Sequence, residues 1–529
     1  MSITVQGVSY IHPDRETLFR NISFVINKGQ KAALIGNNGS GKSTLLQLIA
    51  GKLELSSGDI SCSSSPYFVP QHFGQYNGMT VSQALGTGLK INALRTILAG
   101  DVSEDHFSTL DEDWDIEERS LTALSFWGLG YVSLDQPMAT LSGGEKTKVF
   151  LSGIKIHCPS IVLMDEPTNH LDMESRQQLY SFIENANQTL LVVSHDISLL
   201  NRLSFIYELA KSEVVAFGGN YDFYKEQKDS QRNAIESSLE EKEKQLRQAK
   251  KTAREAAERK QREDARGKKH GEKKGIPKIV MGNLKDKAEK STAKLAGTHL
   301  EKMGGLKEEI KTIQNSLPNN NLMKLGFNNS LLHTGKILVE AKEINFYYSK
   351  IKLWKKPLTF QIRSGDRLSI TGKNGSGKTT LLNIITGELD PRNGAITRAD
   401  FSPVYIDQEY AVIDNSKNLT EQVEAFNTSH LSDHEIKTLL NRFLFPYAVW
   451  DKKCESLSGG ERMRLLLCCL LAGNKAPDMI LLDEPTNNLD IQSADILAAI
   501  VRDYKGTVLV ISHDRHFIDE IGIEKTIEL

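Results

Sequence analysis

A nine-residue glycine-rich segment occurs twice in this chain and constrains its fold more than any other feature. GNNGSGKST begins at Gly36, and GKNGSGKTT begins at Gly372, 336 residues later. Each copy fits the pattern GxxxxGK[ST], follows a β-rich apolar stretch and precedes a helix-forming segment. A strand, a loop and a helix in this order cradle phosphate with backbone N–H groups. The sequence therefore predicts two α/β domains, each built around a phosphate-binding loop.

Four further motifs recur in the same order, which shows that the repeat extends over both halves of the chain. They are VPQ and IDQ ending at Gln71 and Gln408, LSGGE at Leu141 and Leu457, DEPTNHLD and DEPTNNLD at Asp165 and Asp483, and SHD at Ser194 and Ser512. The offsets are 337, 316, 318 and 318 residues, so the first copy has about 21 extra residues between its glutamine and LSGGE. This insertion includes the acidic segment GDVSEDHFSTLDEDWDIEER, for which we expect an elaborated helical subdomain rather than a nucleic-acid contact.

The segment between the copies has a different composition, rich in Lys, Glu, Arg, Gln and Ala. Residues 241–300 contain 19 Lys and Arg against 9 Asp and Glu, a net charge of +10, which leaves −12 on the rest of the chain. Helical apolar periodicity on both sides of a central glycine-rich stretch predicts an antiparallel helical hairpin with a basic tip. The glycines of that stretch and Pro277 are expected to interrupt the helix, starting at Gly267 and Gly271. The predicted domains are therefore 1–225, a linker 226–335 with its tip near 267–282, and 336–529.

Phosphate binding is assigned to the two loops. In the first copy we expect nucleotide contacts from Gly36, Asn37, Asn38, Gly39, Ser40, Gly41, Lys42, Ser43, Thr44 and Gln71. In the second copy we expect them from Gly372, Lys373, Asn374, Gly375, Ser376, Gly377, Lys378, Thr379, Thr380 and Gln408. Lys42 and Lys378 are expected to hold the β and γ phosphates of ATP, because a lysine at this position of the pattern reaches them.

Two carboxylates follow each of the apolar runs IVLM and MILL, which are typical of buried parallel strands. Asp165 and Asp483 are expected to bind Mg²⁺, with the hydroxyls of Ser43 and Thr379 and with Gln71 and Gln408 as further ligands. Glu166 and Glu484 are expected to orient and deprotonate the attacking water. His195 and His513, each after another β-rich strand, are expected to sense the γ-phosphate and support that water.

LSGGE supplies a second kind of anion site, since a serine and two glycines open a helix there without a lysine. This site needs a phosphate bound elsewhere in the chain, which favours a head-to-tail arrangement of the copies. Ser458, Gly459 and Gly460 would then complete the site at Gly36, and Ser142, Gly143 and Gly144 the site at Gly372. Bound ATP would hold the copies together, and its hydrolysis would release them.

Adenine stacking requires an aromatic side chain near each loop. Tyr10 is the candidate in the first copy, and Tyr347 or Tyr348 in the second, with Tyr347 preferred. Ordinary strand packing is the alternative interpretation of each of these tyrosines.

Composition excludes some function classes. No stretch approaches the length of about 18–20 apolar residues that spans a bilayer, and the polar start MSITVQGVSY lacks a signal-peptide pattern, so we expect a cytoplasmic protein. The five cysteines have no metal-ligand spacing and are expected to be reduced thiols. The chain ends soon after His513, so no long C-terminal extension is expected.

With these motifs, and with FGGNYDFYKEQ leading into the linker and SHDRHF in the second copy, the chain resembles the ABC-F family of translation-associated ATPases over nearly its whole length. The resemblance implies an α/β fold class with two P-loop NTPase ATP-binding cassette domains joined by an α-helical hairpin linker. It also implies ATP and Mg²⁺ as cofactors, cassettes that pair within a monomer, and binding to the ribosome near the tRNA exit and peptidyl-transferase sites. SHDISLL in the first cassette departs from the family's usual SHDRxFL, and Asn488 stands where the first cassette has His170. These differences lie beside the catalytic set and not within it, so both sites are expected to hydrolyse ATP, at rates that can differ.

The resemblance directs attention to the linker tip. Lys268, Lys269, His270, Lys273, Lys274 and Lys278 are the candidate contacts to rRNA or tRNA. A solvated face of a coiled coil is the alternative interpretation of this charge run. A general translation factor and an antibiotic-protection factor both fit the sequence. An energising subunit of a membrane transporter and a nucleic-acid repair ATPase are the competing classes, although transporter subunits rarely carry such a hairpin and the zinc-finger cysteines of repair ATPases are missing.

Overall fold

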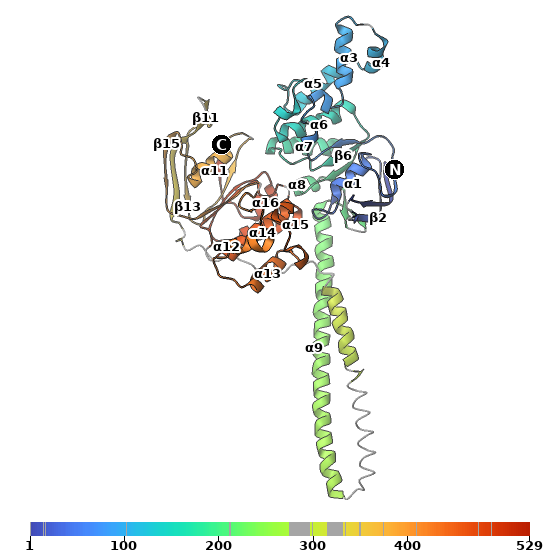
Figure 1. Cartoon of the computed structure of the whole chain (residues 1–529), viewed down its shortest axis with the longest axis vertical. Coiled ribbons are helices and arrows are strands. Elements are labelled where there is room, and N and C mark those ends of the chain that lie inside the picture. The colour runs from blue at the N-terminus through green and yellow to red at the C-terminus, as the bar shows by residue number, and fades with distance from the viewer. Residues whose placement is uncertain are drawn as a thin grey trace. The chain divides into compact units, whose positions relative to one another are not determined.

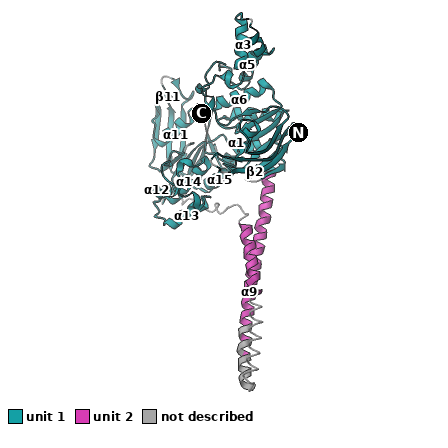
Figure 2. Cartoon of the chain, turned by 45° about the vertical axis from the view of Figure 1, so that its right-hand side comes forward, with its two compact units in different colours: residues 1–222, 322–529 teal, residues 223–321 magenta. Residues whose placement is uncertain are grey.

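The computed structural model describes residues 2–529 except 14, 16, 102, 211–212, 275–296, 299, 315–331, 334, 349–350, 374, 409, 474–475 and 488; within helix α9 (Tyr221–Lys274) it describes only the backbone of 260–261, 263–265 and 267–274. The chain forms two compact units (Figure 2). One unit, Met1–Asp222 with Leu322–Leu529, contains both copies of the repeat. The other, Phe223–Asn321, contains the linker helices.

The first cassette is organised around a mostly parallel sheet with the strand order β5-β6-β7-β3-β8-β9. Its strands are β3 (Lys31–Ile35), β5 (Tyr67–Val69), β6 (Ile161–Asp165), β7 (Thr189–Val193), β8 (Phe205–Leu209) and β9 (Val214–Gly218), of which only β9 pairs antiparallel. Every residue of β6 and β7 is buried, as expected for central strands covered on both faces. A separate antiparallel sheet with the order β2-β1-β4 consists of β1 (Ile3–Ile11), β2 (Thr17–Ile26) and β4 (Ser57–Cys62).

The second cassette repeats this plan, so the chain has the predicted α/β class with two phosphate-loop domains. Its parallel sheet has the order β16-β17-β18-β14-β19 and consists of β14 (Arg367–Thr371), β16 (Pro403–Ile406), β17 (Met479–Asp483), β18 (Thr507–Ile511) and β19 (Lys525–Glu528). The antiparallel strands are β10 (Ile337–Asn345), β13 (Leu358–Arg363) and β15 (Asn393–Arg398), and β11 (Tyr347–Tyr348) pairs with β12 (Ile351–Lys352). The pairs β6–β7 and β17–β18 occupy equivalent places, which explains why the motifs after them recur.

Each cassette contains helices packed on its sheets, and in the first cassette α3 and α4 project away from the sheets (Figure 1). In the first they are α1 (Lys42–Ile49), α2 (Val81–Ala84), α3 (Gly88–Leu98), α4 (Glu104–Leu110), α5 (Ile116–Phe126), α6 (Gly143–His157), α7 (Met173–Asn185) and α8 (Ile197–Leu200). In the second they are α11 (Lys378–Thr386), α12 (Leu419–Phe426), α13 (Asp433–Arg442), α14 (Gly459–Ala472), α15 (Ile491–Asp503) and α16 (Arg515–Glu520).

The acidic insertion is helical, as the sequence predicts. It follows α3 and forms α4 and the start of α5. Its carboxylates are paired with cations of the same subdomain: Arg119 lies 2.7 Å from Asp113, and Arg95 lies 2.6 Å from Glu117. The acidic run is thus internally neutralised in part and accounts for the packing of α3 against α5.

The linker unit is an antiparallel helical hairpin, as predicted. α9 forms the outgoing arm, and residues 300–314 form a returning helix beside it (Figure 1). Lys242 of α9 and Glu309 of the returning helix form an ion pair at 2.6 Å. Leu306 and Ile310 are each only 8% exposed, so the apolar stripe of the returning helix is covered.

The prediction that Gly267 and Gly271 interrupt the outgoing helix is wrong. α9 continues through both glycines to Lys274. Each glycine costs a helix only about 1 kcal/mol relative to alanine, and the neighbouring Lys, Glu, Arg and Ala residues are strong helix formers. Gly275, Pro277 and Gly282 lie outside the described residues.

A glycine in α6 permits a close approach that we expect to be essential for stability. A Cβ atom at Gly153 would overlap the hydroxyl of Tyr67, which donates a hydrogen bond of 2.9 Å to the carbonyl of Phe150 in the same helix. Gly153→Ala should lower the free energy of unfolding by about 1–3 kcal/mol through overpacking, although alanine favours helices. The urea-unfolding midpoint, followed by circular dichroism, measures this effect.

Two controls separate overpacking from helix propensity. Adding Tyr67→Phe, which removes the overlapping hydroxyl, should restore part of the loss. Gly304→Ala, at a helical position where no atom lies within 4 Å of the added Cβ, should be neutral or stabilising. Equal losses from Gly153→Ala and Gly304→Ala would contradict the interpretation.

Candidate functional site

The two phosphate loops connect β3 to α1 and β14 to α11, and their glycines are required by backbone geometry. Gly41 and Gly377 cap the helices with φ angles of 96° and 90°, in the left-handed region that glycine adopts without strain. A Cβ at Gly41 would also lie 2.7 Å from the side chain of Leu18. The ammonium group of Lys42 donates to the carbonyl of Gly36 at 2.7 Å, so the lysine lies over its own loop. Both loops therefore present backbone N–H groups and one ammonium group to the same space.

Lys378 repeats this arrangement and donates to the carbonyl of Gly372 at 2.8 Å. Burial lowers the pKa of Lys378 and of Lys42, because an ammonium group loses hydration there. An anionic ligand would compensate this cost.

Each glutamate after the buried strands is held in an unusual backbone conformation. Glu166 and Glu484 have φ angles of 48° and 49°, which are rare for residues other than glycine. Their N–H groups donate to the carbonyls of Val193 and Ile511 on the neighbouring strands, both at 2.8 Å. Each carboxylate is 7% exposed. This strain, present twice at equivalent positions, directs both glutamates to a defined place.

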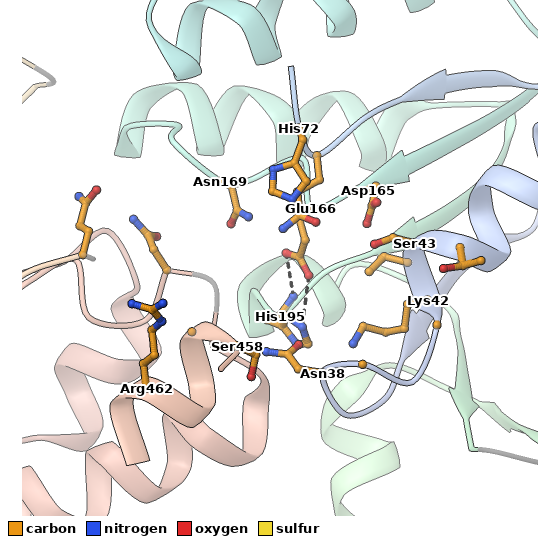
Figure 3. Close-up of a pocket in the computed structure, with 18 of the residues that line it drawn as sticks. Asn38, Lys42, Ser43, His72, Asp165, Glu166, Asn169, His195, Ser458 and Arg462 are labelled. Carbon is orange, nitrogen blue, oxygen red and sulfur yellow. Dashed lines mark hydrogen bonds and ion pairs between the residues drawn. The ribbon is translucent and has the colours of Figure 1, made fainter. Parts of the chain in front are cut away.

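A histidine contacts each of these glutamates with nearly the same geometry. The backbone N–H of His195 donates to Glu166 at 3.3 Å, and its Nε2 lies 3.4 Å from Glu166 Oε1 (Figure 3). The corresponding distances for His513 and Glu484 are 3.4 and 3.3 Å. The structure therefore brings each predicted base and its predicted supporting histidine into contact.

Burial favours the uncharged form of both the glutamate and the histidine in each pair. Burial raises the pKa of Glu484 to about 7 and lowers the pKa of His513 to about 4. In the first cassette burial shifts the pKa values of Glu166 and His195 in the same directions. Negative charge at either strand end is therefore costly until a cation or a hydrogen-bond donor approaches.

The residues after the phosphate loops and strands fit a Mg²⁺ ion. Thr379 Oγ1 donates to Asp483 Oδ2 at 3.0 Å, which places the predicted hydroxyl and carboxylate ligands side by side. Among the described residues, Asp165 Oδ1 is buried without a hydrogen-bond partner. No group of three His, Cys, Asp or Glu side chains in the described part of the chain is arranged to enclose a metal by itself. Such a sparse oxygen set suits Mg²⁺, which keeps water and substrate phosphate as ligands.

Two cavities are each built from both cassettes. The first, of about 1000 Å³, is lined by the phosphate loop of the first cassette together with Ser458, Gly459 and Arg462 of the second (Figure 3). The second, of about 580 Å³, is lined by the other phosphate loop together with Ser142, Gly143 and Gly144. This pairing is the head-to-tail arrangement that the sequence predicts.

Most predicted site residues line these cavities. The first is lined by Asn38, Gly39, Gly41, Lys42, Ser43, Thr44, Gln71, Asp165, Glu166, His195, Gln408, Ser458 and Gly459. The second is lined by Ser142, Gly143, Gly144, Gly375, Gly377, Lys378, Thr379, Thr380, Gln408, Asp483, Glu484 and His513. Gly36, Asn37, Ser40, Gly372, Lys373, Ser376 and Gly460 shape the loops without lining the space, and Asn374 lies outside the described residues.

The tyrosines preferred for adenine stacking do not line the cavities, and stacking itself stays a prediction. His12, not Tyr10, lines the first cavity, and the ring of Tyr10 packs between those of His12 and Phe19. Tyr348, not Tyr347, lines the second cavity. Successive strand residues point to opposite faces, so the hydroxyl of Tyr348 reaches Thr380 at 3.1 Å while Tyr347 reaches Asn393.

Several residues at or beside the cavities were not predicted from the sequence, although some of them belong to a repeated motif. Asn169 and Asn487 occupy the same position of the repeated DEPTN motif. Asp490 ends that motif in the second cassette, and its carboxylate accepts a hydrogen bond of 3.2 Å from the N–H of Asn38 in the first. His72 follows the predicted Gln71 directly and had no separate signal.

The linker residues predicted to contact RNA remain a prediction. Lys268, Lys269, His270, Lys273 and Lys274 belong to α9, but their side chains are outside the described part, as is all of Lys278. Among the described residues, no helix combines the length and the apolar composition that crossing a membrane requires.

Comparison with known proteins gives full-length similarities. A family profile described as "ABC transporter" matches residues 19–169 and 355–487, more than half of the chain. The energy-dependent translational throttle protein EttA of Escherichia coli (strain K12) is 30% identical over 98% of this chain and 90% of its own length. The uncharacterized ABC transporter ATP-binding protein YfmM of Bacillus subtilis (strain 168) is 27% identical over 99% of this chain and 97% of its own.

The fold has also been seen in a solved structure. The archaeal ribosome recycling factor aABCE1, in its complex with the ribosomal stalk protein aP1, matches with a TM-score of 0.58 and 18% identity over 99% of this chain and 87% of that one. Such low identity establishes the tandem-cassette fold alone. With both cassettes matched by the family profile, and with a 30% identical relative aligned over nearly all of both chains, this protein is an ATPase of the ABC-F family, a tandem ATP-binding cassette protein.

Proposed function

We propose that this ATPase binds ATP in both composite cavities and uses its binding and hydrolysis to act on the ribosome through the basic linker hairpin. The observation that carries the proposal is that each cavity takes its phosphate loop from one cassette and its LSGGE helix from the other. A bound ATP therefore bridges the cassettes, and cleavage of its terminal phosphate removes the bridge. ATP thereby controls closure of the chain.

The side chains have complementary roles in this scheme. Lys42 and Lys378 bind the β and γ phosphates, while Ser43 with Asp165, and Thr379 with Asp483, hold Mg²⁺. Bound Mg²⁺ supplies charge neutralisation on the phosphate oxygens. Glu166 and Glu484 orient the attacking water and accept its proton.

The two switch histidines complete each site. Because His195 and His513 have lowered pKa values, each stays neutral near pH 7 and offers one ring N–H. The backbone N–H of each histidine holds the carboxylate of its glutamate in place. The ring N–H of the histidine is then the donor toward the part of the cavity where the γ-phosphate binds.

The ribosome is proposed as the partner on two grounds. The charge of the chain is segregated, with +10 on residues 241–300 and −12 elsewhere, so RNA phosphates are attracted to the linker and repelled by the cassettes. The relative EttA is by its name a translational throttle. A general effect on translation is the broader form of the proposal, and protection against antibiotics is the narrower one.

Replacing both catalytic glutamates tests the chemical step. Glu166→Gln with Glu484→Gln should lower the ATP turnover roughly 100-fold or more, because general-base catalysis contributes about that factor. The variant should still bind ATP and close, since glutamine keeps the size of the side chain. Phosphate release from the purified full-length chain measures turnover, and filter retention of labelled ATP measures binding.

Lys42→Ala with Lys378→Ala is the matched control, and it should lose ATP binding as well as turnover. Turnover that stays at the wild-type level in the glutamine variant would contradict the assigned base.

The aromatic residue of the second cavity offers a test with a neighbouring control. Tyr348→Ala should weaken ATP binding there by about 1–3 kcal/mol, the usual value of base stacking on an aromatic side chain. Tyr347→Ala, one residue away and facing Asn393, should leave it within twofold. ATP titration of the Glu166→Gln and Glu484→Gln chain measures both. Equal effects of the two substitutions would show that the stacking assignment is wrong.

Co-sedimentation with ribosomes tests the partner. The double glutamine variant should sediment with ribosomes in ATP, and deletion of residues 267–282 should weaken this retention and its dependence on salt, because fewer phosphates are neutralised. Replacing Lys268, Lys269, Lys273 and Lys274 by Gln is the matched control that keeps the length of the hairpin. A lack of retention with any nucleotide would remove the ribosome from the proposal and favour the transporter or repair classes.

A further inference from the structure

The two cassettes differ at one buried position beside the nucleotide sites. Helices α7 and α15 start after the same motif, and Asp172 and Asp490 cap them equivalently by accepting from Ser175 and Ser493. Four residues after each capping aspartate, the first cassette has Arg176 and the second has Ala494. The repeat therefore contains an arginine on one side that has no counterpart on the other.

Arg176 is buried with most of its donors unused. The residue is 8% exposed, and its Nε donates to the carbonyl of Leu171 at 3.1 Å. Nη1 lies 3.7 Å from Asp196 Oδ2, which is an ion-pair distance but too long for a hydrogen bond. Among the described residues, neither Nη atom has a hydrogen-bond acceptor. Arg176 lines the second cavity, so the free N–H groups of its guanidinium are available to an anion bound there.

The nearest carboxylate is already engaged by other groups. Asp196 accepts the N–H of Leu199 at 3.1 Å and caps α8. It also accepts a hydrogen bond from the hydroxyl of Tyr180. Asp196 therefore holds the guanidinium in place electrostatically without consuming its donors.

Arg176 reaches the nucleotide site of the other cassette. It lines the second cavity together with Lys378, Glu484 and His513, all of which belong to the second cassette. Burial and the charge of Lys378 are the main causes that lower the pKa of His513, and the charge of Arg176 lowers it further, as expected for a nearby cation. The second cavity thus has an arginine from α7 of the other cassette, whereas Ala494, at the equivalent position of α15, offers no cation to the first cavity, where the cation from the other cassette is Arg462 of α14.

We propose that Arg176 is a trans-acting residue of the second site, where its guanidinium binds the oxygens of a terminal phosphate group. The planar fork of arginine matches a phosphate group, and a cation there stabilises the charge that develops during phosphoryl transfer. Two sources have this chemistry, the γ-phosphate of ATP and the inorganic phosphate left after cleavage. This inference rests on the proposed nucleotide sites and makes the two sites unequal in their dependence on the partner cassette.

Single-site backgrounds in the full-length chain test the proposal without the ribosome. Glu166→Gln leaves turnover to the second site, and Glu484→Gln leaves it to the first. Arg176→Gln should lower the phosphate-release turnover about tenfold or more in the Glu166→Gln background, within the range known for arginines that stabilise phosphoryl transfer. In the Glu484→Gln background it should change turnover less than twofold. Arg176→Lys should recover part of the loss, because it restores the charge without the fork.

Arg202→Gln is the control for packing against Tyr180. Arg202 lies 4.4 Å from the ring of the same Tyr180 and pairs with Glu184 at 2.8 Å, but it does not line the second cavity. Its loss should lower the melting temperature without a difference between the two backgrounds. A loss for Arg176→Gln that is equal in both backgrounds, or no loss in the Glu166→Gln background, would overturn the proposal. If neither glutamine background lowers turnover, the site assignment itself fails, which is a separate outcome.

Two binding measurements identify the phosphate source. Weaker ATP retention by Arg176→Gln in the double glutamine chain assigns the contact to the γ-phosphate. Unchanged ATP retention with weaker trapping of ADP by orthovanadate, a phosphate analogue, in the Glu166→Gln background assigns it to the cleaved phosphate. Unchanged retention and trapping would remove the phosphate contact.

Discussion

Neutralising the triphosphate is the constraint on which the rest of this structure depends. One phosphate loop supplies an ammonium group and a row of N–H groups, and each cavity is completed by residues of the other cassette. These residues come from the start of the LSGGE helix, where the serine caps the helix: the N–H of Glu461 donates to Ser458 Oγ and the N–H of Glu145 to Ser142 Oγ, both at 3.4 Å. The capped helix start is rigid and keeps its first N–H groups available. A complete site therefore needs both cassettes in one chain.

Within each cassette, several groups of the site are held in energetically unfavourable positions. The strained glutamates, the buried carboxylates and the lysines folded over their loops are all unfavourable before nucleotide and metal arrive. Nucleotide and metal would offset these costs at the place where chemistry occurs. The near identity of the Glu166–His195 and Glu484–His513 geometries shows that both cassettes retain this preparation. The two nucleotide sites differ in the residues around these Glu–His pairs. Arg176 corresponds to Ala494, and His12 lines the first cavity where Tyr348 lines the second.

The sequence predicted the two folds and the residues local to each motif, because strand, loop and helix are contiguous there and backbone geometry leaves few alternatives. It failed where the answer depended on side-chain direction. Tyr347 and Tyr348 differ only by the alternation of a two-residue strand, whose register no local signal defines. Arg176 was missed because it lines a cavity with Lys378, Glu484 and His513 of the other cassette, and no motif marks it. The helix through Gly267 and Gly271 was misjudged because two glycines are a small cost to a long helix with strong helix formers around them.

The hairpin obtains its order from a different source than the cassettes. Along α9 the described side chains form ion pairs one turn apart, among them Arg232 with Glu236 at 2.9 Å and Arg254 with Glu258 at 3.1 Å. Such pairs contribute only about 0.2–0.5 kcal/mol each and weaken with salt. In residues 241–300 the cations outnumber the carboxylates by 19 to 9. Those cations repel one another along the helix, so an RNA backbone that neutralises them would stabilise the hairpin as well as bind it. RNA affinity and hairpin rigidity should therefore rise and fall together.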